Sequence, residues 1–173
     1  MPDRSWNSAT WDGSYDWDAG GESRFLGRMN AAASRLGLRS THYADPAGLD
    51  ARTASTAADQ VRLAVAALGL PVFAQIVAQP SAELPEAGTV LNYDTMLGVD
   101  GIVGVKTGYT HAAGGTMVVA ARTTAHGHSV LIIGVILGVP GGEDTAFGQT
   151  LDAADQLVVG VERLLADHAG SAE

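Results

Sequence analysis

The run from Gly101 to Thr110 constrains this chain most, because an apolar segment there leads directly into Lys-Thr-Gly. Ile102, Val103 and Val105 favour an extended strand, since β-branched side chains pack well on a pleated surface. Lys106 is the only lysine in the chain, so chemistry that needs a side-chain ammonium group must use it. The run therefore predicts a β-strand that lines a cleft.

Residues 106–108 supply groups that suit an anionic ligand. The Lys106 ammonium and the Thr107 hydroxyl can both donate hydrogen bonds to a carboxylate. Gly108 removes a side chain where another backbone could approach closely. The tripeptide alone is a weak signal, because chance can produce it.

Lys-Thr-Gly belongs to a known motif set, with S-x-x-K and S-D-N, in penicillin-binding proteins and class A β-lactamases. From Phe25 to about Leu137 the chain resembles the D-alanyl-D-alanine carboxypeptidases, the serine peptidase family that includes low-molecular-weight penicillin-binding proteins. The matching segments, in chain order, are Phe25 with Met29-Asn30, Leu36-Gly37-Leu38, Thr41-His42-Tyr43, Asp45-Pro46-Ala47-Gly48-Leu49, Ser55-Thr56-Ala57 with Asp59, Leu91-Asn92, and Lys106-Thr107-Gly108-Tyr109-Thr110 followed by Ala113-Gly114.

The resemblance implies a reaction and a set of roles. In the family, the S-x-x-K serine attacks the carbonyl of the penultimate D-alanine of a peptidoglycan stem peptide, and water then hydrolyses the acyl-enzyme. Lys106 would supply positive potential for the substrate carboxylate, and Thr107 would hydrogen-bond it. The backbone N–H of Tyr109, after Gly108, would be one oxyanion-hole donor. The resemblance implies no cofactor and no metal.

The nucleophile and its base cannot be located in this sequence. Val103 stands three residues before the only lysine, so the chain contains no S-x-x-K. A hydroxyl needs an adjacent base to act as a nucleophile at neutral pH, so we expect this chain not to run the family's mechanism alone. Ser5 and Asn7, in Ser5-Trp6-Asn7, have the residue types of S-x-N. The segment after them lacks the expected Ala/Leu-rich helix, which favours coincidence over a true remnant.

Composition narrows the classes of partner and compartment. The net charge is −9 and no Lys/Arg cluster exists, which argues against nucleic-acid binding. There are no cysteines, so disulfides and thiolate metal sites are excluded. Residues 1–6 lack the basic start and apolar run of a signal peptide, and no apolar stretch reaches the roughly 18 residues that span a bilayer. The family resemblance nevertheless implies an extracytoplasmic location, in the cell envelope or secreted.

Three segments differ in composition. We expect residues 1–24 to be a poorly ordered tail, residues 25–168 to be a partial D,D-peptidase domain, and residues 169–173 to be a C-terminal tail. Trp6, Trp11 and Trp17 all fall in the first segment. An aromatic carbohydrate-binding patch is the alternative interpretation of these tryptophans, but stacking platforms need a rigid scaffold.

Helix signals dominate the first half of the domain. We expect Ser23 to cap a helix that runs to about Leu36 and ends at Gly37, with a core face made of Phe25, Leu26, Met29, Ala32, Ala33 and Leu36.

Further along, the composition of residues 45–48 predicts a turn. Thr56 and Asp59 have capping-box spacing for a helix that ends at Gly69, and a short helix is expected over 72–77. Residues 80–88 are expected to form a loop.

Strand signals dominate the second half. The expected strands are 89–91, 101–107, 115–122 and 128–137, with a turn at 125–127. The last strand is a continuous apolar run, so we expect it to be central and buried on both faces. An amphipathic helix should follow from about Phe147 to Leu165. Together these elements predict an α+β fold of the β-lactamase/transpeptidase type, with an antiparallel sheet flanked by helices.

The other candidate residues are weaker indications of a functional site. His126 and His128 flank a hairpin glycine and could be metal ligands, but a solvated turn explains them as well. His42 is isolated, and His111 could border the cleft or be a plain loop residue. A last pair, Asp152 and Asp155, should lie on the solvated side of the final helix.

Three functions remain open. The first is a serine-type D-Ala-D-Ala carboxypeptidase homologue, of the kind that trims stem peptides, whose sequence has lost its N-terminal part and which is inactive as this chain. The second is a non-catalytic module that binds cell-wall peptides, and the third is a structural or partner-binding domain. β-Lactams should bind only if the nucleophile were present. We also expect an exposed apolar patch and self-association through the exposed sheet or cleft.

Overall fold

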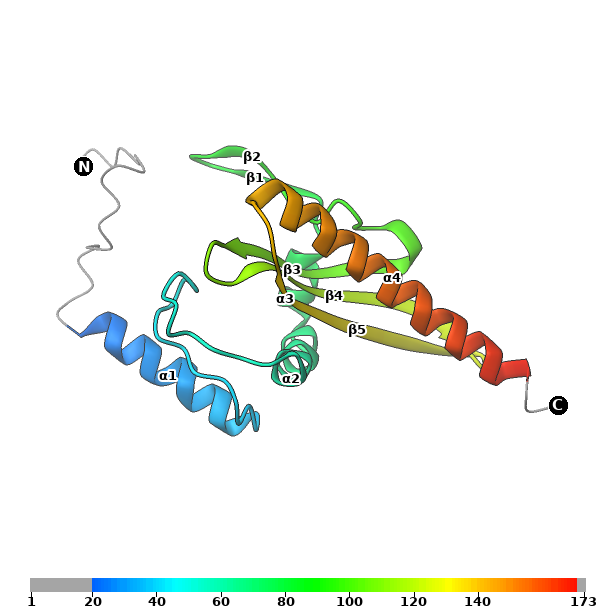
Figure 1. Ribbon diagram of the computed structural model, residues 1–173, viewed down its shortest axis with the longest axis horizontal. Coiled ribbons are helices and arrows are strands. Elements are labelled where there is room, and N and C mark those ends of the chain that lie inside the picture. Colours follow the sequence, from blue (N-terminus) through cyan, green and yellow to red (C-terminus); the bar gives the residue numbers. More distant parts are fainter. Residues whose placement is uncertain (1–19, 171–173) are drawn as a thin grey trace.

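The structure is a computed structural model that describes residues 20–170 (Figure 1). The candidate Ser5-Trp6-Asn7 motif and the three tryptophans lie outside the described residues. In chain order the elements are α1 (Gly21–Arg35), α2 (Ala57–Leu68), α3 (Pro71–Val77), β1 (Ser81–Leu84), β2 (Gly88–Leu91), the 3-10 helix η2 (Val99–Gly101), β3 (Ile102–Thr110), β4 (Gly114–Ala125), β5 (His128–Val139) and α4 (Glu143–Gly170).

A three-stranded antiparallel sheet carries the Lys-Thr-Gly strand. The strand order is β3-β4-β5, so β4 is central and pairs on both sides. A tight turn joins β4 to β5, and its residues His126 (φ 52°) and Gly127 (φ 75°) both have positive φ, as two-residue hairpin turns require. The expected turn at 125–127 and the α+β architecture with an antiparallel sheet are confirmed.

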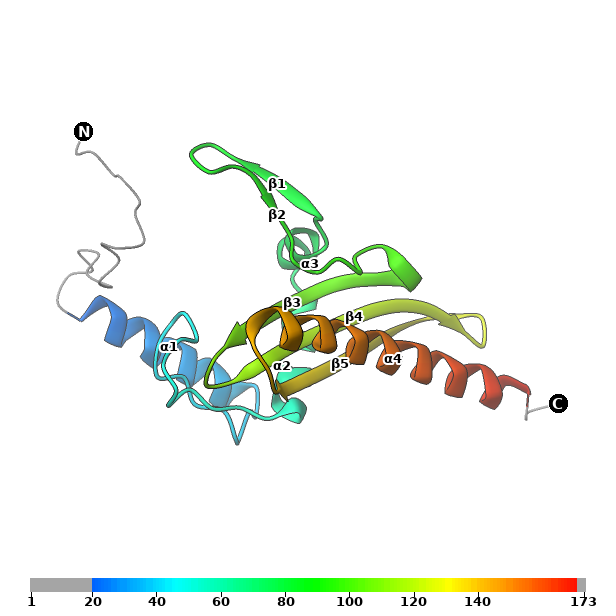
Figure 2. The ribbon, with the colours of Figure 1, turned by 45° about the horizontal axis from the view of Figure 1, so that its top comes forward.

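The expectation that the last strand is central was wrong. Within the described chain, β5 pairs only with β4 and forms one edge of the sheet. Both of its faces are nevertheless covered, since α4 packs on one and α2 on the other (Figure 2). A strand covered on both faces has a continuous apolar sequence whether or not its edge is paired.

The core lies between β4 and α4. Met117 and Val119 on β4 are 1% and 0% exposed, and they pack with Ala154 and Val158 on α4. Gly115 lets the helix approach closely, because a Cβ built there would lie 2.7 Å from the carbonyl oxygen of Ala146. The amphipathic terminal helix is therefore confirmed, and it runs diagonally across the sheet (Figure 1).

The helix α2 forms as its sequence predicts. The Thr56 hydroxyl accepts a hydrogen bond from the Asp59 backbone N–H at 3.3 Å, and the helix ends at the C-cap Gly69. The short helix α3 begins with Pro71 in its first turn, where a missing N–H costs nothing.

Two expectations about α1 were wrong. The helix begins at Gly21 with Gly20 as its N-cap, so Ser23 lies inside the first turn instead of capping it. The expected core face was wrong for Phe25 and Leu36, which are 42% and 38% exposed, whereas Ala33 is buried and Leu26, Met29 and Ala32 are half-buried. The C-terminal end is as expected: Gly37 adopts φ 72° just after the last turn.

Residues 80–88 were expected to be a loop, which was wrong for Ser81–Leu84. That segment is β1, and it pairs with β2 as a separate antiparallel hairpin. Its own sequence has little strand preference, so the pairing with Thr89 and Val90 is what makes it extended. The Thr89 hydroxyl also donates a hydrogen bond to Glu83 across the hairpin, at 2.5 Å.

No single helix within residues 20–170 is both long and apolar enough to cross a membrane, and α2 and α3 pass that test only as a pair bent by 110°.

Candidate functional site

The strand β3 presents Lys-Thr-Gly on the edge of the sheet opposite β5. The Lys106 side chain is exposed, whereas Thr107 is 8% exposed and lies opposite Met117 of β4. The Lys106 ammonium donates a hydrogen bond to the carbonyl oxygen of Thr107. The predicted strand is thus confirmed, and it continues three residues beyond the expected end, to Thr110.

Gly108 has a steric role in this strand. The Thr116 hydroxyl donates a hydrogen bond to the Gly108 carbonyl oxygen at 3.2 Å, and a Cβ on Gly108 would lie 2.9 Å from that hydroxyl. A larger residue at 108 would push Thr116 aside or change the strand. Glycine therefore preserves the path of the backbone between Thr107 and Tyr109.

Two cavities meet at this strand, and Lys106 and Thr107 line both. The first, of about 620 Å³, is bounded by residues 48–51 and 53–55 together with Gln60 of α2. The second, of about 600 Å³, is bounded by Tyr93 and by the start of α4. The ammonium and the hydroxyl are therefore placed where a ligand in either cavity could reach them.

The end of the turn at 45–48 reaches both cavities, since Gly48 and the following Leu49 line each of them. The Asp45 carboxylate accepts hydrogen bonds from the backbone N–H groups of Ala47 and Leu49, at 3.2 and 2.8 Å, and from the Thr53 hydroxyl at 3.1 Å. Burial alone would raise the pKa of Asp45, but these hydrogen bonds to its charged form outweigh burial and lower it. The expected turn is confirmed, and Asp45 fixes its shape.

A polar network that sequence reasoning did not find reaches the first cavity through Ser55 and Gln60, which line it. The Thr41 hydroxyl donates to Asp59 at 2.9 Å and shares a hydrogen bond with Ser55, also at 2.9 Å. Gln60 donates to the Ser55 hydroxyl at 2.9 Å. Thr41, Ser55 and Asp59 all fall in the segments that carry the family resemblance, and this was the only available signal.

Tyr109 ties the end of β3 to the loop that precedes α4. Its hydroxyl donates a hydrogen bond to the carbonyl oxygen of Gly141 at 3.2 Å, and it lies 3.2 Å from His111 Nδ1. Because the hydroxyl proton is used on Gly141, Nδ1 of His111 donates to the phenolic oxygen. His111 is exposed and contacts the Tyr109 ring edge to face, with ring centroids 5.7 Å apart.

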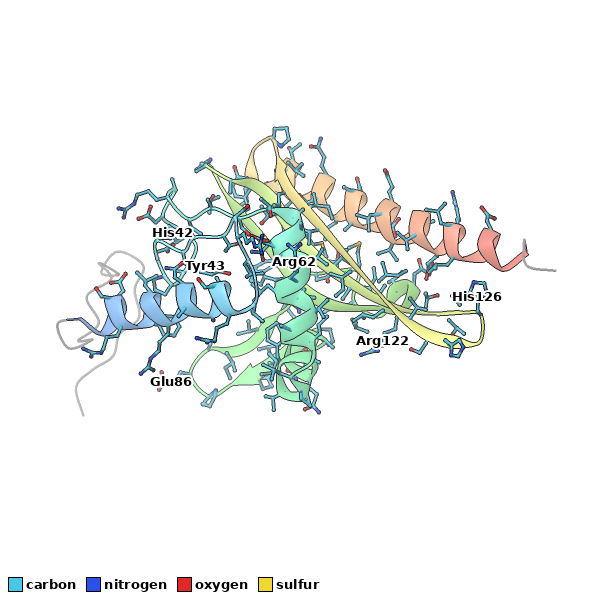
Figure 3. All side chains as sticks on the ribbon, turned by 90° about the horizontal axis from the view of Figure 1, so that it is seen from below. His42, Tyr43, Arg62, Glu86, Arg122 and His126 are labelled. Atoms are coloured by element: carbon cyan, nitrogen blue, oxygen red, sulfur yellow. The ribbon has the colours of Figure 1, made fainter. Side chains whose placement is uncertain are left out.

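The other sequence candidates lie away from this site. His126 is exposed in the β4–β5 turn, at the end of the molecule opposite His42 (Figure 3). His42 pairs through its backbone with Ala54. Residues 20–170 contain no group of three His, Cys, Asp or Glu side chains that could hold a metal ion. On α4, Asp152 is exposed and Asp155 is half-buried.

Asp94 is a further buried acid that sequence reasoning missed. It is 4% exposed, and its Oδ2 atom has no hydrogen-bond partner. Burial raises the pKa of Asp94, and the hydrogen bond that Oδ1 accepts from the Met96 N–H only partly opposes this shift. Nothing in the local sequence distinguished it from a solvated turn residue.

The chain resembles known proteins over most of its length. In curated sequences it is 43% identical over 127 residues to D-alanyl-D-alanine carboxypeptidase DacB2 of Mycobacterium tuberculosis, covering 69% of this chain and 43% of that protein. It is 31% identical over 123 residues to a D-alanyl-D-alanine endopeptidase of Escherichia coli, covering 66% of this chain and 38% of that protein. The chain therefore spans less than half the length of these relatives.

Solved structures show the same likeness. A D-alanyl-D-alanine carboxypeptidase of M. tuberculosis superposes with a TM-score of 0.63 at 35% identity, over 83% of this chain and 55% of that chain. A point mutant of the Streptomyces K15 DD-transpeptidase superposes with a TM-score of 0.64 at 27% identity, over 82% of this chain and 56% of that chain. Cefotaxime-bound penicillin-binding protein D2 of Listeria monocytogenes gives 0.66 at 23% identity, over 80% and 56%, and so shows the fold alone.

The family model of the D-alanyl-D-alanine carboxypeptidases matches residues 5–141. The matched range covers the Lys-Thr-Gly strand, the turn at 45–48 and the Thr41–Asp59 network, and it begins at Ser5. The chain therefore belongs to the D-alanyl-D-alanine carboxypeptidase family.

Proposed function

We propose that this chain provides the substrate-holding half of a D-alanyl-D-alanine peptidase site. It binds the C-terminal carboxylate of a peptidoglycan stem peptide through Lys106 and Thr107, and does not cleave the peptide by itself. The observation that carries this proposal is the position of Lys-Thr-Gly on an edge strand beside two cavities, in a sequence without S-x-x-K.

The groups on β3 suit a carboxylate. The exposed ammonium of Lys106 supplies positive charge, and the Thr107 hydroxyl can donate a hydrogen bond beside it. The backbone N–H of Tyr109 is the proposed oxyanion donor. Removing one such donor typically costs about 2.7–4 kcal/mol of transition-state stabilisation where a nucleophile is present.

Cleavage needs a serine activated by a base, and this sequence offers no S-x-x-K pair. Ser5 and Asn7 remain candidates for the S-x-N motif, and the family match that starts at Ser5 supports them. Trimming of stem peptides would therefore need a nucleophile from outside this sequence. Peptidoglycan lies outside the cytoplasmic membrane, so the proposed function is extracytoplasmic.

An NMR titration with acetyl-D-alanyl-D-alanine tests the binding step. Binding should weaken with rising salt, because the attraction to Lys106 is screened. Lys106→Ala should abolish binding, and Thr107→Val should weaken it by about 1.5–3 kcal/mol, the worth of a hydrogen bond to a charged group. Arg122→Ala, on β4 away from both cavities, is the control. Equal binding by Lys106→Ala and the wild type would overturn the proposal.

A labelling experiment tests the absence of cleavage. The purified chain should not be labelled covalently by a fluorescent penicillin and should release no D-alanine from the same peptide. Stoichiometric labelling at neutral pH would show that an unrecognised serine acts as the nucleophile.

A further inference from the structure

We propose that the outer side of α1 is a docking surface for the headgroups of an anionic phospholipid bilayer. The surface, termed the arginine face, is made of exposed side chains on one side of the helix and just after it: Arg24, Phe25, Arg28, Arg35, Leu36 and Arg39. The inference goes beyond the proposed function, because none of these residues lines the two cavities beside β3.

The α1 region is basic in a chain that is otherwise acidic. Between Glu22 and Asp45 the sequence has four arginines and no acidic residue, whereas the whole chain has 10 Lys and Arg against 19 Asp and Glu. The four arginines are not adjacent in the sequence, so they form no contiguous cluster there. They gather on one surface because this segment folds as a helix.

The helix turns its arginines away from the protein. At 3.6 residues per turn, the three arginines within α1 lie within about 40° of one another around the helix axis. The other side of the helix holds it in place. Ala33 is buried there, and the Asn30 side chain exchanges two hydrogen bonds of 2.9 Å with the backbone of Tyr43. These contacts fix which side of α1 faces outward.

Apolar side chains border the arginines on the exposed side. Phe25 and Leu36 are 42% and 38% exposed, and they lie within roughly a quarter-turn of Arg28 around the axis. Helices that lie in a membrane interface carry arginine on one side and Phe or Leu beside it, so that the guanidinium groups reach the phosphates while the apolar groups enter the acyl boundary. The arginine face has this combination.

The spacing of the arginines favours an extended anionic surface over a single small anion. Arg28 and Arg35 are about 10 Å apart along the helix axis, at 1.5 Å per residue. Each guanidinium can form paired hydrogen bonds with a separate phosphate. A bilayer presents phosphates in such an array, whereas a pocket for one phosphate would need side chains that converge on one point.

The net charge of −9 does not prevent this docking. Charges farther from the bilayer than about 8 Å are largely screened at physiological ionic strength. The C-terminal end of α4, with Glu162 and Asp167, lies at the opposite end of the molecule from α1 (Figure 1). Its acidic side chains therefore repel a bilayer at α1 only weakly.

Flotation of the whole chain with vesicles tests the proposal. The wild type should bind vesicles of phosphatidylglycerol and phosphatidylcholine at low salt, be released at high salt, and not bind phosphatidylcholine alone. The double variant Arg28→Gln with Arg35→Gln should bind at least tenfold more weakly, since each arginine near an anionic surface is worth about fivefold in affinity.

A matched double variant controls for net charge. Arg122→Gln with Arg163→Gln removes two exposed arginines from β4 and α4, and it should bind the vesicles like the wild type. The variant at Arg28 and Arg35 should still bind acetyl-D-alanyl-D-alanine normally, which separates this surface from the site at β3. Leu36→Gln removes apolar surface and no charge, and should weaken vesicle binding about threefold.

Four results would overturn the proposal. Equal losses in the two double variants would show that net charge governs binding. Unchanged binding by Leu36→Gln would assign the arginine face to a soluble polyanion. Displacement by inorganic phosphate beyond that by chloride at equal ionic strength would assign it to a small anion. Self-association in buffer that requires Arg28 and Arg35, without vesicle binding by the wild type, would assign it to a second copy of this chain.

Discussion

The Asp59 carboxylate on α2 accepts a hydrogen bond from the backbone N–H of Ser40, at 2.8 Å, and so joins two segments that lie 19 residues apart. The same oxygen accepts from the Thr41 hydroxyl at 2.9 Å, and the other oxygen accepts from Arg62 at 2.9 Å. Burial alone would raise the pKa of Asp59, but these donors and the Arg62 charge outweigh burial and lower it.

We expect Asp59→Asn to destabilise the protein near neutral pH and to flatten its acid sensitivity. Because the folded pKa lies below the unfolded value, the contribution of Asp59 to the free energy of unfolding is present above about pH 4 and is lost as the pH falls through the folded pKa. Urea denaturation between pH 3 and pH 7 measures this. Parallel curves for the variant and the wild type would contradict the assignment.

Asp94 should change the pH dependence of stability in the direction opposite to Asp59. Its pKa is raised, so its contribution favours folding at acid pH and is lost as the pH rises through the folded pKa. Asp94→Asn keeps an oxygen for the Met96 N–H and removes the buried charge. We expect the variant to be at least as stable as the wild type at pH 7 and relatively less stable at pH 4. A large loss of stability at pH 7 would show that the anion has a partner in solution.

Local signals in the sequence were sufficient for much of the fold. The Thr56 and Asp59 spacing predicted α2, because an N-cap acts within one turn. Glycine at 127 predicted the hairpin turn, because positive φ is a local requirement. The motif Lys106-Thr107-Gly108 identified the proposed ligand-binding strand only together with the other family segments that precede it in order.

The remaining features depend on contacts between distant segments. β1 is extended because it pairs with β2. Within residues 20–170, β5 is an edge strand because only β4 pairs with it. Tyr93 and Phe147 come together only because α4 returns across the sheet to the loop after β2. Local sequence periodicity carries no information about contacts between residues so far apart in the chain. The wall of the second cavity formed by Tyr93 and Phe147 could therefore not be predicted.

The β5 edge should drive self-association of this chain. Across 128–139 the strand has no proline and no Lys, Arg, Asp or Glu, the residues that usually protect an edge from pairing with another chain. Leu131→Glu places a charge on this edge, opposite Arg122 of β4, with which it can pair.

Sedimentation velocity should show less association for Leu131→Glu than for the wild type. The control is Leu84→Glu on the β1–β2 hairpin, which also removes an exposed leucine. If both variants lower association equally, general apolar exposure is responsible and the β5 edge is not.

A pair of glycine substitutions should separate close packing from helix propensity. Gly115→Ala should destabilise the protein by about 1–3 kcal/mol, the usual cost of overpacking, because the new Cβ would meet the Ala146 carbonyl oxygen and the Thr150 hydroxyl on α4. Gly160→Ala lies inside α4, where a Cβ would meet no heavy atom within 4 Å, and it should stabilise the protein by about 0.5–1 kcal/mol. Chemical denaturation measures both. Equal effects of the two substitutions would mean that α4 does not dock on β4 at Gly115.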